Sequence, residues 1–285
     1  IQGAQSFKLP RLEAQMLMLH ALGRSTQDRA WLLTHDADEL DASTLAKFTD
    51  FCARRAANEP IAYITGHKEF FGLLLKIDAR VLDPRPDTET LVDWGLACLT
   101  GLPKPCVLDL GTGSGAVALA LASELASQRR EATVHASDAS QQALEVAREN
   151  AEHLGIPVAL GYGNWFANDL PDQLYDLIVS NPPYIEADDP HLQALAHEPI
   201  QALVSGHYGL DDIRQIVQEA PAHLKPGGWL LLEHGYNQAE PVRSLLALAG
   251  FEEVQSRKDL KGIERCAGAK WPGGHINEII LPQRI

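Results

Sequence analysis

Residues 106–115 decide the fold of most of this chain, and they read Cys-Val-Leu-Asp-Leu-Gly-Thr-Gly-Ser-Gly. The first five form a short apolar run typical of a buried strand, and the apolar residues 116–125 favour a helix. The glycines between them allow positive φ angles and close approach of a ligand, and the helix start offers free N–H groups. The stretch therefore predicts a strand, a ligand-binding turn and a helix; a tight turn without a ligand is the alternative.

The same alternation continues along the chain. Strands are predicted over 133–137, 158–162, 177–180, 229–233, 251–257 and 276–281, and helices over 141–154, 210–224 and 240–248. Strands that are apolar throughout and separated by helices indicate an α/β fold, with a parallel sheet covered on both faces.

The residues before this region follow other patterns. Apolar residues recur three and four positions apart between 12 and 33, and Asp41 is a plausible helix start, so residues 1–66 are expected to form a small helical bundle domain. That domain serves either stability or substrate recognition. Residues 70–77 are strand-like around Gly72, which predicts a β-hairpin linker over 67–84 before an α/β domain over 85–285.

Composition narrows the class of protein. Hydrophobic residues make up 45% of the 285 residues and charged residues 22%, as in globular proteins, and no apolar run approaches the ~18 residues of a membrane helix. Residues 1–10 lack a signal-peptide pattern, and the chain, which begins with Ile1, is expected to be trimmed. The four cysteines form no C-x-x-C pair and the histidines lack metal-ligand spacing. We therefore expect no metal, no membrane partner and a cytoplasmic location.

The charge disfavours nucleic acid as a partner. The formal net charge is -14, and residues 66–285 hold 30 Asp and Glu against 17 Lys and Arg. Binding to DNA or RNA depends largely on cationic side chains that neutralise phosphates. No stable nucleic-acid binding is therefore expected.

Two aspartates flank the glycine loop in the predicted sheet. Asp109 lies just before the loop, which is compatible with an amino-acid-like cationic ligand rather than a pyrophosphate. Asp138 ends the next strand, where an acidic side chain accepts hydrogen bonds from the hydroxyls of a ribose. Ribose binding is our interpretation of Asp138, and a helix cap for the segment starting at Ser140 is the alternative.

Residues 181–184 read Asn-Pro-Pro-Tyr and follow the strand predicted at 177–180, at the end where open α/β sheets place their sites. The prolines fix φ and remove two N–H donors, which leaves carbonyl acceptors. The Asn181 side chain and the Pro182 carbonyl can hold the two N–H groups of a planar NH₂, while Tyr184 lies flat on it. The motif indicates methylation of a planar nitrogen by positioning and electrostatics, and a plain proline turn is the alternative.

With these motifs the chain resembles the HemK-type (PrmC) release factor glutamine methyltransferases, S-adenosylmethionine-dependent enzymes with a Rossmann-like seven-strand domain. The resemblance covers nearly the whole chain. It rests on residues 59–66 and 69–72, Arg85-Pro86-Asp87-Thr88-Glu89, Asp109 to Gly115, Asn181 to Tyr184, and Leu231-Leu232-Glu233-His234-Gly235. The glycine loop and the Asn-Pro-Pro-Tyr motif also occur in other methyltransferases. The motifs at 59–72, 85–89 and 231–235 are more specific to this family.

The resemblance implies a cofactor site and a substrate site. The residues implied to bind S-adenosylmethionine are Gly111, Thr112, Gly113, Ser114, Gly115, Asp138, Trp165 and Asn181, with Trp165 near the adenine. Those implied to hold the glutamine are Asn181, Pro182, Pro183 and Tyr184, of which Asn181, Pro182 and Tyr184 are the implied catalytic residues. The implied partners are peptide-chain release factors, methylated at N5 of the glutamine in a Gly-Gly-Gln loop.

Two details and two rival functions remain. Gly163-Asn164 stands before Trp165, where the family often has Ser-Asp. Arg85 and Glu89 are expected to form a structural ion pair over the pocket, with a catalytic role as the alternative. The rivals are an adenine-N6 or guanine-N2 nucleic-acid methyltransferase, which uses a similar loop, and an inactive S-adenosylmethionine-binding module.

Overall fold

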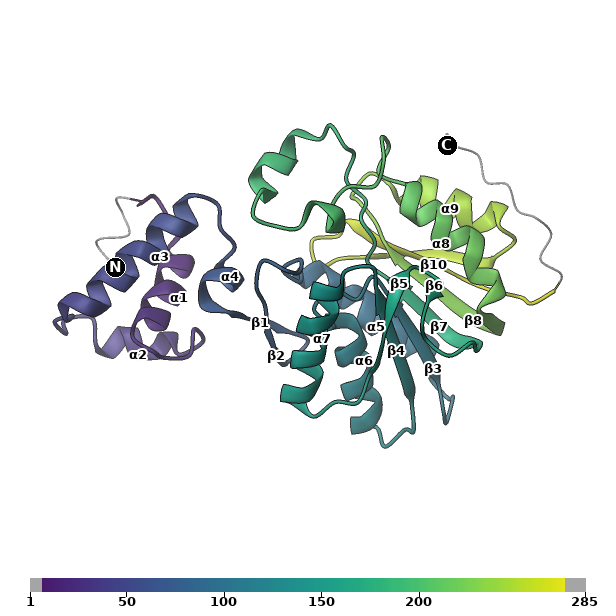
Figure 1. Cartoon of the computed structure of the whole chain (residues 1–285), viewed down its shortest axis with the longest axis horizontal. Helices are drawn as coiled ribbons and strands as arrows, with labels where there is room; N and C mark the ends of the chain where they lie inside the picture. Colours follow the sequence, from purple (N-terminus) through teal and green to yellow (C-terminus); the bar gives the residue numbers. More distant parts are fainter. Residues whose placement is uncertain (1–6, 275–285) are drawn as a thin grey trace.

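The computed structural model describes residues 7–274 and shows a small helical lobe beside a larger α/β lobe (Figure 1). The helices of the small lobe are α1 (Arg11–Ala21), α2 (Arg29–Thr34), α3 (Ala42–Ala56) and α4 (Ile61–Thr65). Helix α3 starts where expected, because the Asp41 side chain accepts a hydrogen bond from the Thr44 N–H at 2.9 Å. Leu17, Leu19 and Cys52 are buried between the helices.

The predicted hairpin joins the two lobes. Strands β1 (His67–Phe70) and β2 (Leu73–Lys76) pair antiparallel. The turn residues Phe71 and Gly72 have φ angles of 48° and 76°, as a two-residue hairpin turn requires. Phe70 is buried in a core of the larger lobe, so the hairpin belongs to the packing of that lobe.

A mixed sheet forms the centre of the larger lobe. Within the described residues it has eight strands in the order β6-β5-β4-β3-β7-β8-β10-β9. They are β3 (Cys106–Leu110), β4 (Thr133–Asp138), β5 (Ala159–Asn164), β6 (Ala167–Asn168), β7 (Tyr175–Ser180), β8 (Leu224–Glu233), β9 (Glu252–Lys258) and β10 (Glu264–Lys270). Neighbours from β5 to β8 are parallel, which confirms the predicted Rossmann-like α/β fold.

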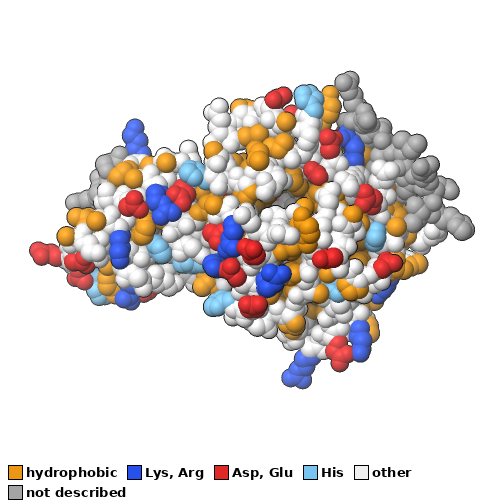
Figure 2. Space-filling model, viewed as in Figure 1, with side chains coloured by type: hydrophobic (Ala, Val, Ile, Leu, Met, Phe, Trp, Pro, Cys, Tyr) orange, Lys and Arg blue, Asp and Glu red, His pale blue; other side chains and the backbone are white. Residues whose placement is uncertain are grey.

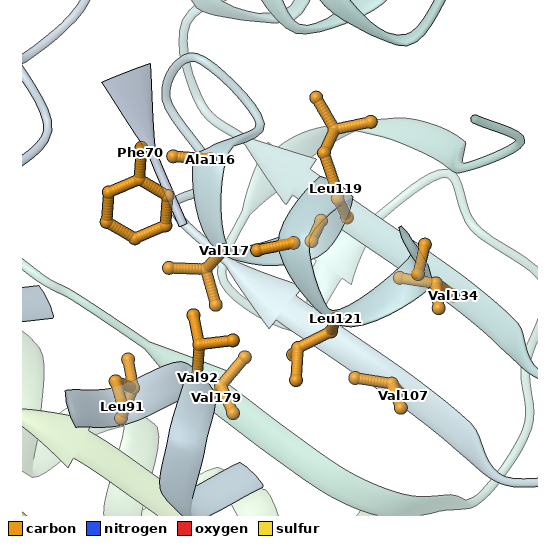
Figure 3. Close-up of a cluster of buried hydrophobic side chains, with 14 of the residues drawn as sticks. Phe70, Leu91, Val92, Val107, Ala116, Val117, Leu119, Leu121, Val134 and Val179 are labelled. Carbon is orange, nitrogen blue, oxygen red and sulfur yellow. The ribbon is translucent and has the colours of Figure 1, made fainter. Parts of the chain in front are cut away.

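Helices cover both faces of this sheet. They are α5 (Glu89–Cys98), α6 (Ala116–Ser127), α7 (Gln141–Leu154), α8 (Asp211–Glu219) and α9 (Ala239–Leu248). Successive strand residues point to opposite faces, so Leu177 packs in the core under α5 and α6, and Ile178 in the core under α8 and α9. Figure 3 shows the first core, where Val92 of α5 and Phe70 of the hairpin lie beside Val117 of α6.

The structure corrects several sequence expectations. The sheet is not wholly parallel, because a short turn joins β9 to β10 and such a turn makes antiparallel neighbours. Helix α5, strand β10 and the 3-10 helices were not predicted. The 3-10 helices are η2 (Pro86–Thr88), η3 (Pro190–Leu195), η4 (Ile200–Ala202) and η5 (Ala220–Ala222). Helix α8 ends before Pro221, earlier than expected. The strand predicted over 276–281 lies outside the described residues.

Candidate active site

A cavity of about 650 Å³ opens at the carboxyl ends of the parallel strands. Its walls include the segments that directly follow β3, β4, β5 and β7, which is where open α/β sheets bind ligands. The linker at 80–82, the start of α7, the segment 199–204 and Asp212 complete the walls. The cavity brings together these residues predicted from the sequence: Gly111, Gly113, Asp138, Trp165, Asn181 and Pro183.

The glycine loop turns over the end of β3. Gly111 and Gly113 have φ angles of 70° and 57°, in the left-handed region that glycine tolerates. The Gly111 N–H donates to the Ser137 carbonyl at 2.9 Å, which ties the loop to β4. A Cβ on Gly111 would lie 3.3 Å from the Trp165 ring, so the missing side chain lets the loop and the indole form adjoining walls.

Thr112, Ser114 and Gly115 do not line the cavity, although all three were expected at the cofactor. The Thr112 hydroxyl and the Ser114 carbonyl are hydrogen-bonded behind the loop, to Asp109 at 2.6 Å and to the Asn150 amide at 2.9 Å. Gly115 precedes α6 with a φ of 83°. These residues therefore brace the loop from behind.

Asp109 also stabilises the glycine loop from the side opposite the cavity. It is 2% exposed and accepts hydrogen bonds from the Thr112 hydroxyl and the Ala118 N–H. Burial raises the pKa of its carboxyl to about 7, and these hydrogen bonds oppose the rise. Asp109 therefore does not face a cationic ligand, contrary to the expectation from its position in the sequence.

Asp138 lies between the glycine loop and α7. Its Oδ2 accepts from the Gly113 N–H at 2.9 Å and its Oδ1 from the Ser140 N–H at 2.8 Å. Burial raises the pKa of the carboxyl, and the two backbone hydrogen bonds act in the opposite direction. Ser140 itself caps α7 by accepting from the Ala143 N–H, so the helix-cap interpretation of Asp138 is wrong. The Asp138 carboxylate forms part of the cavity wall.

Trp165 forms another wall of the cavity. The Asn168 side chain donates to the Trp165 carbonyl at 2.7 Å and holds this residue at a φ of 48°. The indole Nε1 is buried and has no hydrogen-bond partner within residues 7–274. Gly163 and Asn164, where the sequence departs from the family pattern, line the cavity next to the ring.

The Asn-Pro-Pro-Tyr loop leaves β7 at the cavity. The Ser180 hydroxyl donates to the Leu110 carbonyl at 2.7 Å, which fixes the tip of β7 to β3. Asn181 and Pro183 line the cavity, and Pro182 is buried. Within the part of the chain that the structure describes, no group donates a hydrogen bond to the Pro182 carbonyl. The loop therefore keeps acceptor capacity that its own fold does not use.

Tyr184 attaches this loop to β8 and to the segment that follows it. Its hydroxyl donates to Glu233 Oε1 at 3.2 Å, and its carbonyl accepts from the Gln238 side chain at 3.0 Å. Burial raises the pKa of the Tyr184 hydroxyl. Tyr184 is not among the lining residues, so the structure does not place it flat on a substrate group as the sequence suggested.

Arg85 and Glu89 do not form the expected ion pair with each other. Arg85 pairs with Glu198 and Asp83, which attaches the linker to the segment between β7 and α8. The Glu89 side chain accepts from the Phe71 N–H at 3.0 Å and attaches α5 to the hairpin turn. Arg85 and Glu89 therefore each connect a different pair of segments.

Two further residues of the same motif reach other parts of the site. Asp87 lies 3.8 Å from Arg265 of β10. The Thr88 hydroxyl accepts from the Asn181 side-chain nitrogen at 3.4 Å. The motif at 85–89 thus connects the hairpin, the strand tips and the segment 185–210 around one cavity.

Sequence reasoning missed Glu198, Gln238 and the role of Glu233. Gln238 is buried, accepts from the Gly235 N–H, and donates to the carbonyls of Tyr184 and Gly209. It therefore joins three loops at the active-site edge. Its position next to the motif at 231–235 was the available signal.

Several Lys and Arg side chains of the surface pair with Asp or Glu side chains. Figure 2 shows Lys and Arg side chains scattered over one face, beside Asp and Glu, and Arg80 at the cavity pairs with Asp78, Glu145 and Glu149. No helix between residues 7 and 274 is long and apolar enough to cross a membrane. The same residues contain no group of three His, Cys, Asp or Glu side chains that could share a metal ion.

Known proteins resemble this chain along its length. The family model of the PrmC N-terminal domain matches residues 4–66, and that of the methyltransferase small domain matches residues 92–258. The chain is 48% identical over 273 residues to the release factor glutamine methyltransferase of Burkholderia pseudomallei, covering 93% of each protein. It is 40% identical over 269 residues to that of Escherichia coli, covering 93% of this chain and 94% of the other. A methyltransferase from Pyrococcus furiosus shares the fold, with a TM-score of 0.52 and 22% identity over 79% of this chain and 99% of the other.

Proposed function

The chain belongs to the release factor glutamine methyltransferases, and we propose that its cavity binds S-adenosylmethionine while the loop at 181–184 holds the substrate glutamine. The enzyme transfers a methyl group from S-adenosylmethionine to the side-chain nitrogen of a glutamine in a release factor. We further propose that this is N5 of the glutamine in a Gly-Gly-Gln loop. The observation that carries the proposal is the placement of Asn181 at the tip of β7, in the wall of the same cavity as Asp138.

The residues present fit the cofactor. Gly111 and Gly113 leave room beside the loop, and Asp138 offers carboxylate oxygens for the hydroxyls of a ribose. Trp165 offers a flat apolar wall for the adenine. When bound, S-adenosylmethionine supplies an electrophilic methyl group on a sulfonium.

The enzyme's own residues position the nucleophile. An amide nitrogen is a weak nucleophile because its lone pair is delocalised. The Asn181 side-chain oxygen and the Pro182 carbonyl accept the two N–H groups and fix the direction in which the nitrogen points. Preorganised acceptors need no rearrangement during the reaction, so the rate gain comes from orientation and electrostatics.

We also propose roles for the remaining parts. Residues 1–66 form a domain that recognises the release factor, residues 67–84 a hairpin linker, and residues 85–285 the methyltransferase domain. Nucleic acid and membrane are not expected partners, because residues 66–285 carry a large excess of acidic side chains. We place the enzyme in the cytoplasm, where release factors act.

Replacement of Asp138 by alanine should chiefly weaken cofactor binding. The change removes the carboxylate proposed to hold the ribose and the acceptor of the Gly113 N–H. Calorimetry with S-adenosylmethionine should give a higher dissociation constant, with turnover partly restored at high cofactor concentration. An unchanged dissociation constant would contradict the ribose assignment.

Mass spectrometry tests the function itself. A release factor incubated with the enzyme and S-adenosylmethionine should gain one methyl group, located on the glutamine of its Gly-Gly-Gln loop. Duplex DNA and structured RNA serve as comparison substrates. Methylation of nucleic acid with no change in the release factor would overturn the proposal.

A further inference from the structure

Gln238 occupies the N-cap position of α9 without capping that helix. N-cap residues are usually Ser, Thr, Asp or Asn, whose short side chains accept a hydrogen bond from a backbone N–H of the first turn. The Gln238 side chain makes no such bond. The residue is 6% exposed and is not among those that line the cavity. Its carboxamide instead bonds backbone groups outside α9.

Three hydrogen bonds fix the carboxamide of Gln238 in one orientation. Its Oε1 accepts from the Gly235 N–H at 2.8 Å, and its Nε2 donates to the carbonyls of Tyr184 at 3.0 Å and Gly209 at 3.2 Å. A backbone N–H only donates and a carbonyl only accepts, so the reversed carboxamide would oppose like groups at all three contacts. The NH₂ group of the side chain is therefore committed to two loop carbonyls.

The loop at 181–184 has few donors of its own. Pro182 and Pro183 have no N–H, so neither can attach the loop to a neighbouring carbonyl. The Ser180 hydroxyl fixes the start of the loop, and the contacts of Tyr184 fix its end. Because the prolines between these points have fixed φ angles, few rotations remain to absorb a displacement of Tyr184 before it reaches the Pro182 carbonyl.

We propose that Gln238 is a positioning residue, which acts through the Tyr184 backbone to set the direction of the Pro182 carbonyl towards the substrate carboxamide. The inference rests on the proposed function for the role of that carbonyl. It places a residue outside the cavity wall among those that control turnover.

The glycine loop is held by separate contacts. Strands β4 and β5 lie on one side of β3 in the sheet, and β7 and β8 lie on the other. The N–H groups of Gly111 and Thr112 both donate to the Ser137 carbonyl of β4, at 2.9 and 3.0 Å. The hydrogen bonds of Gln238 lie on the β8 side. We therefore expect their loss to lower turnover without weakening cofactor binding.

Gln238→Glu tests the inference in the full-length enzyme with a release factor as substrate. The change keeps the side-chain length and the acceptor oxygen, but it replaces the donating NH₂ with an oxygen that faces two carbonyl oxygens. We expect kcat to fall by about tenfold or more, and the dissociation constant of S-adenosylmethionine to stay nearly unchanged. The stoichiometry of cofactor binding, measured by calorimetry, counts the folded enzyme, so kcat can be expressed per intact site.

Two further variants complete the test. Gln238→Met introduces no charge and should show the same loss of turnover, and it decides the question if Gln238→Glu does not fold. Gln255→Glu makes the same chemical change at an exposed glutamine of β9 and should keep the wild-type turnover. Wild-type kcat in the Gln238 variants, or a loss of cofactor affinity as large as the loss of kcat, would overturn the inference.

Hydrogen exchange measured by NMR without substrate separates this inference from the proposed function. The N–H groups of Tyr184 and Ile185 both donate to the Leu203 carbonyl, at 3.2 and 2.8 Å. These two amides should exchange faster in Gln238→Glu than in the wild type, and the two bonded amides of the glycine loop at an unchanged rate. Unchanged exchange at Tyr184 and Ile185, or faster exchange in both loops, would contradict the inference even if the release factor is methylated. A release factor left unmethylated by the wild-type enzyme would instead contradict the proposed function.

Discussion

Replacing Asn181 with alanine is expected to lower the turnover number by on the order of 10² or more, and to leave the dissociation constant of S-adenosylmethionine nearly unchanged. The variant removes one of the two acceptors that orient the substrate NH₂. The Pro182 carbonyl alone leaves the carboxamide free to rotate, so fewer bound complexes have the nitrogen correctly directed. Single-turnover methylation at saturating cofactor measures this loss without interference from product release.

The control for this variant is Asn237→Ala. Asn237 is an exposed asparagine after β8, at the same edge of the sheet, and should tolerate the change. If Asn181→Ala turns over at nearly the wild-type rate, then Asn181 is not the acceptor. A large loss of cofactor affinity would instead indicate that Asn181 chiefly holds S-adenosylmethionine.

The second large effect is expected for Gly209→Ala. Gly209 has a φ of 67°, and a Cβ at this position would lie 2.3 Å from the Tyr184 carbonyl oxygen and 2.7 Å from the Gln238 side chain. The loop at 181–184 or the segment that carries Gly209 must shift to relieve this contact. A displacement of about 1 Å at a positioning group can lower turnover by roughly 10², and overpacking typically costs about 1–3 kcal/mol of stability.

Gly155→Ala is a matched control for this change. Gly155 has a φ of 65°, almost the same backbone strain, but a Cβ there meets no atom within 4 Å. The difference in unfolding free energy between the two variants therefore isolates the clash. Equal stability together with equal turnover would show that Gly209 does not support the loop.

Much of the larger lobe was predictable because its central strands are runs of large apolar residues. The apolar run at 106–110 is typical of a buried central strand, and the glycines after it mark the turn. Strand β10 lacks this signal, because it contains alanine and glycine in place of large apolar residues. The reason is spatial: a Cβ on Gly268 would lie 2.9 Å from the Trp94 ring of α5, so the strand is built to fit under the helix.

The candidate site was predictable at the strand ends and not elsewhere. Asp138 ends β4, Trp165 and Asn181 directly follow β5 and β7, and the parallel sheet brings such positions to one edge. The burial of Asp109 within β3 and the position of Tyr184 outside the cavity wall were not predicted, because the sequence does not show in which direction a side chain points. Glu198 contacts Arg85 across 113 residues of chain, and no local pattern reports such a contact.

The central claim is that Asn181 and Pro182 together hold the carboxamide of a glutamine at the tip of β7. A crystal structure with S-adenosylhomocysteine and a peptide containing the Gly-Gly-Gln sequence tests it most directly. We predict that the glutamine nitrogen lies about 3 Å from both the Asn181 side-chain oxygen and the Pro182 carbonyl oxygen. A glutamine carboxamide bound away from these two oxygens, with the nucleoside in the cavity, would contradict the claim.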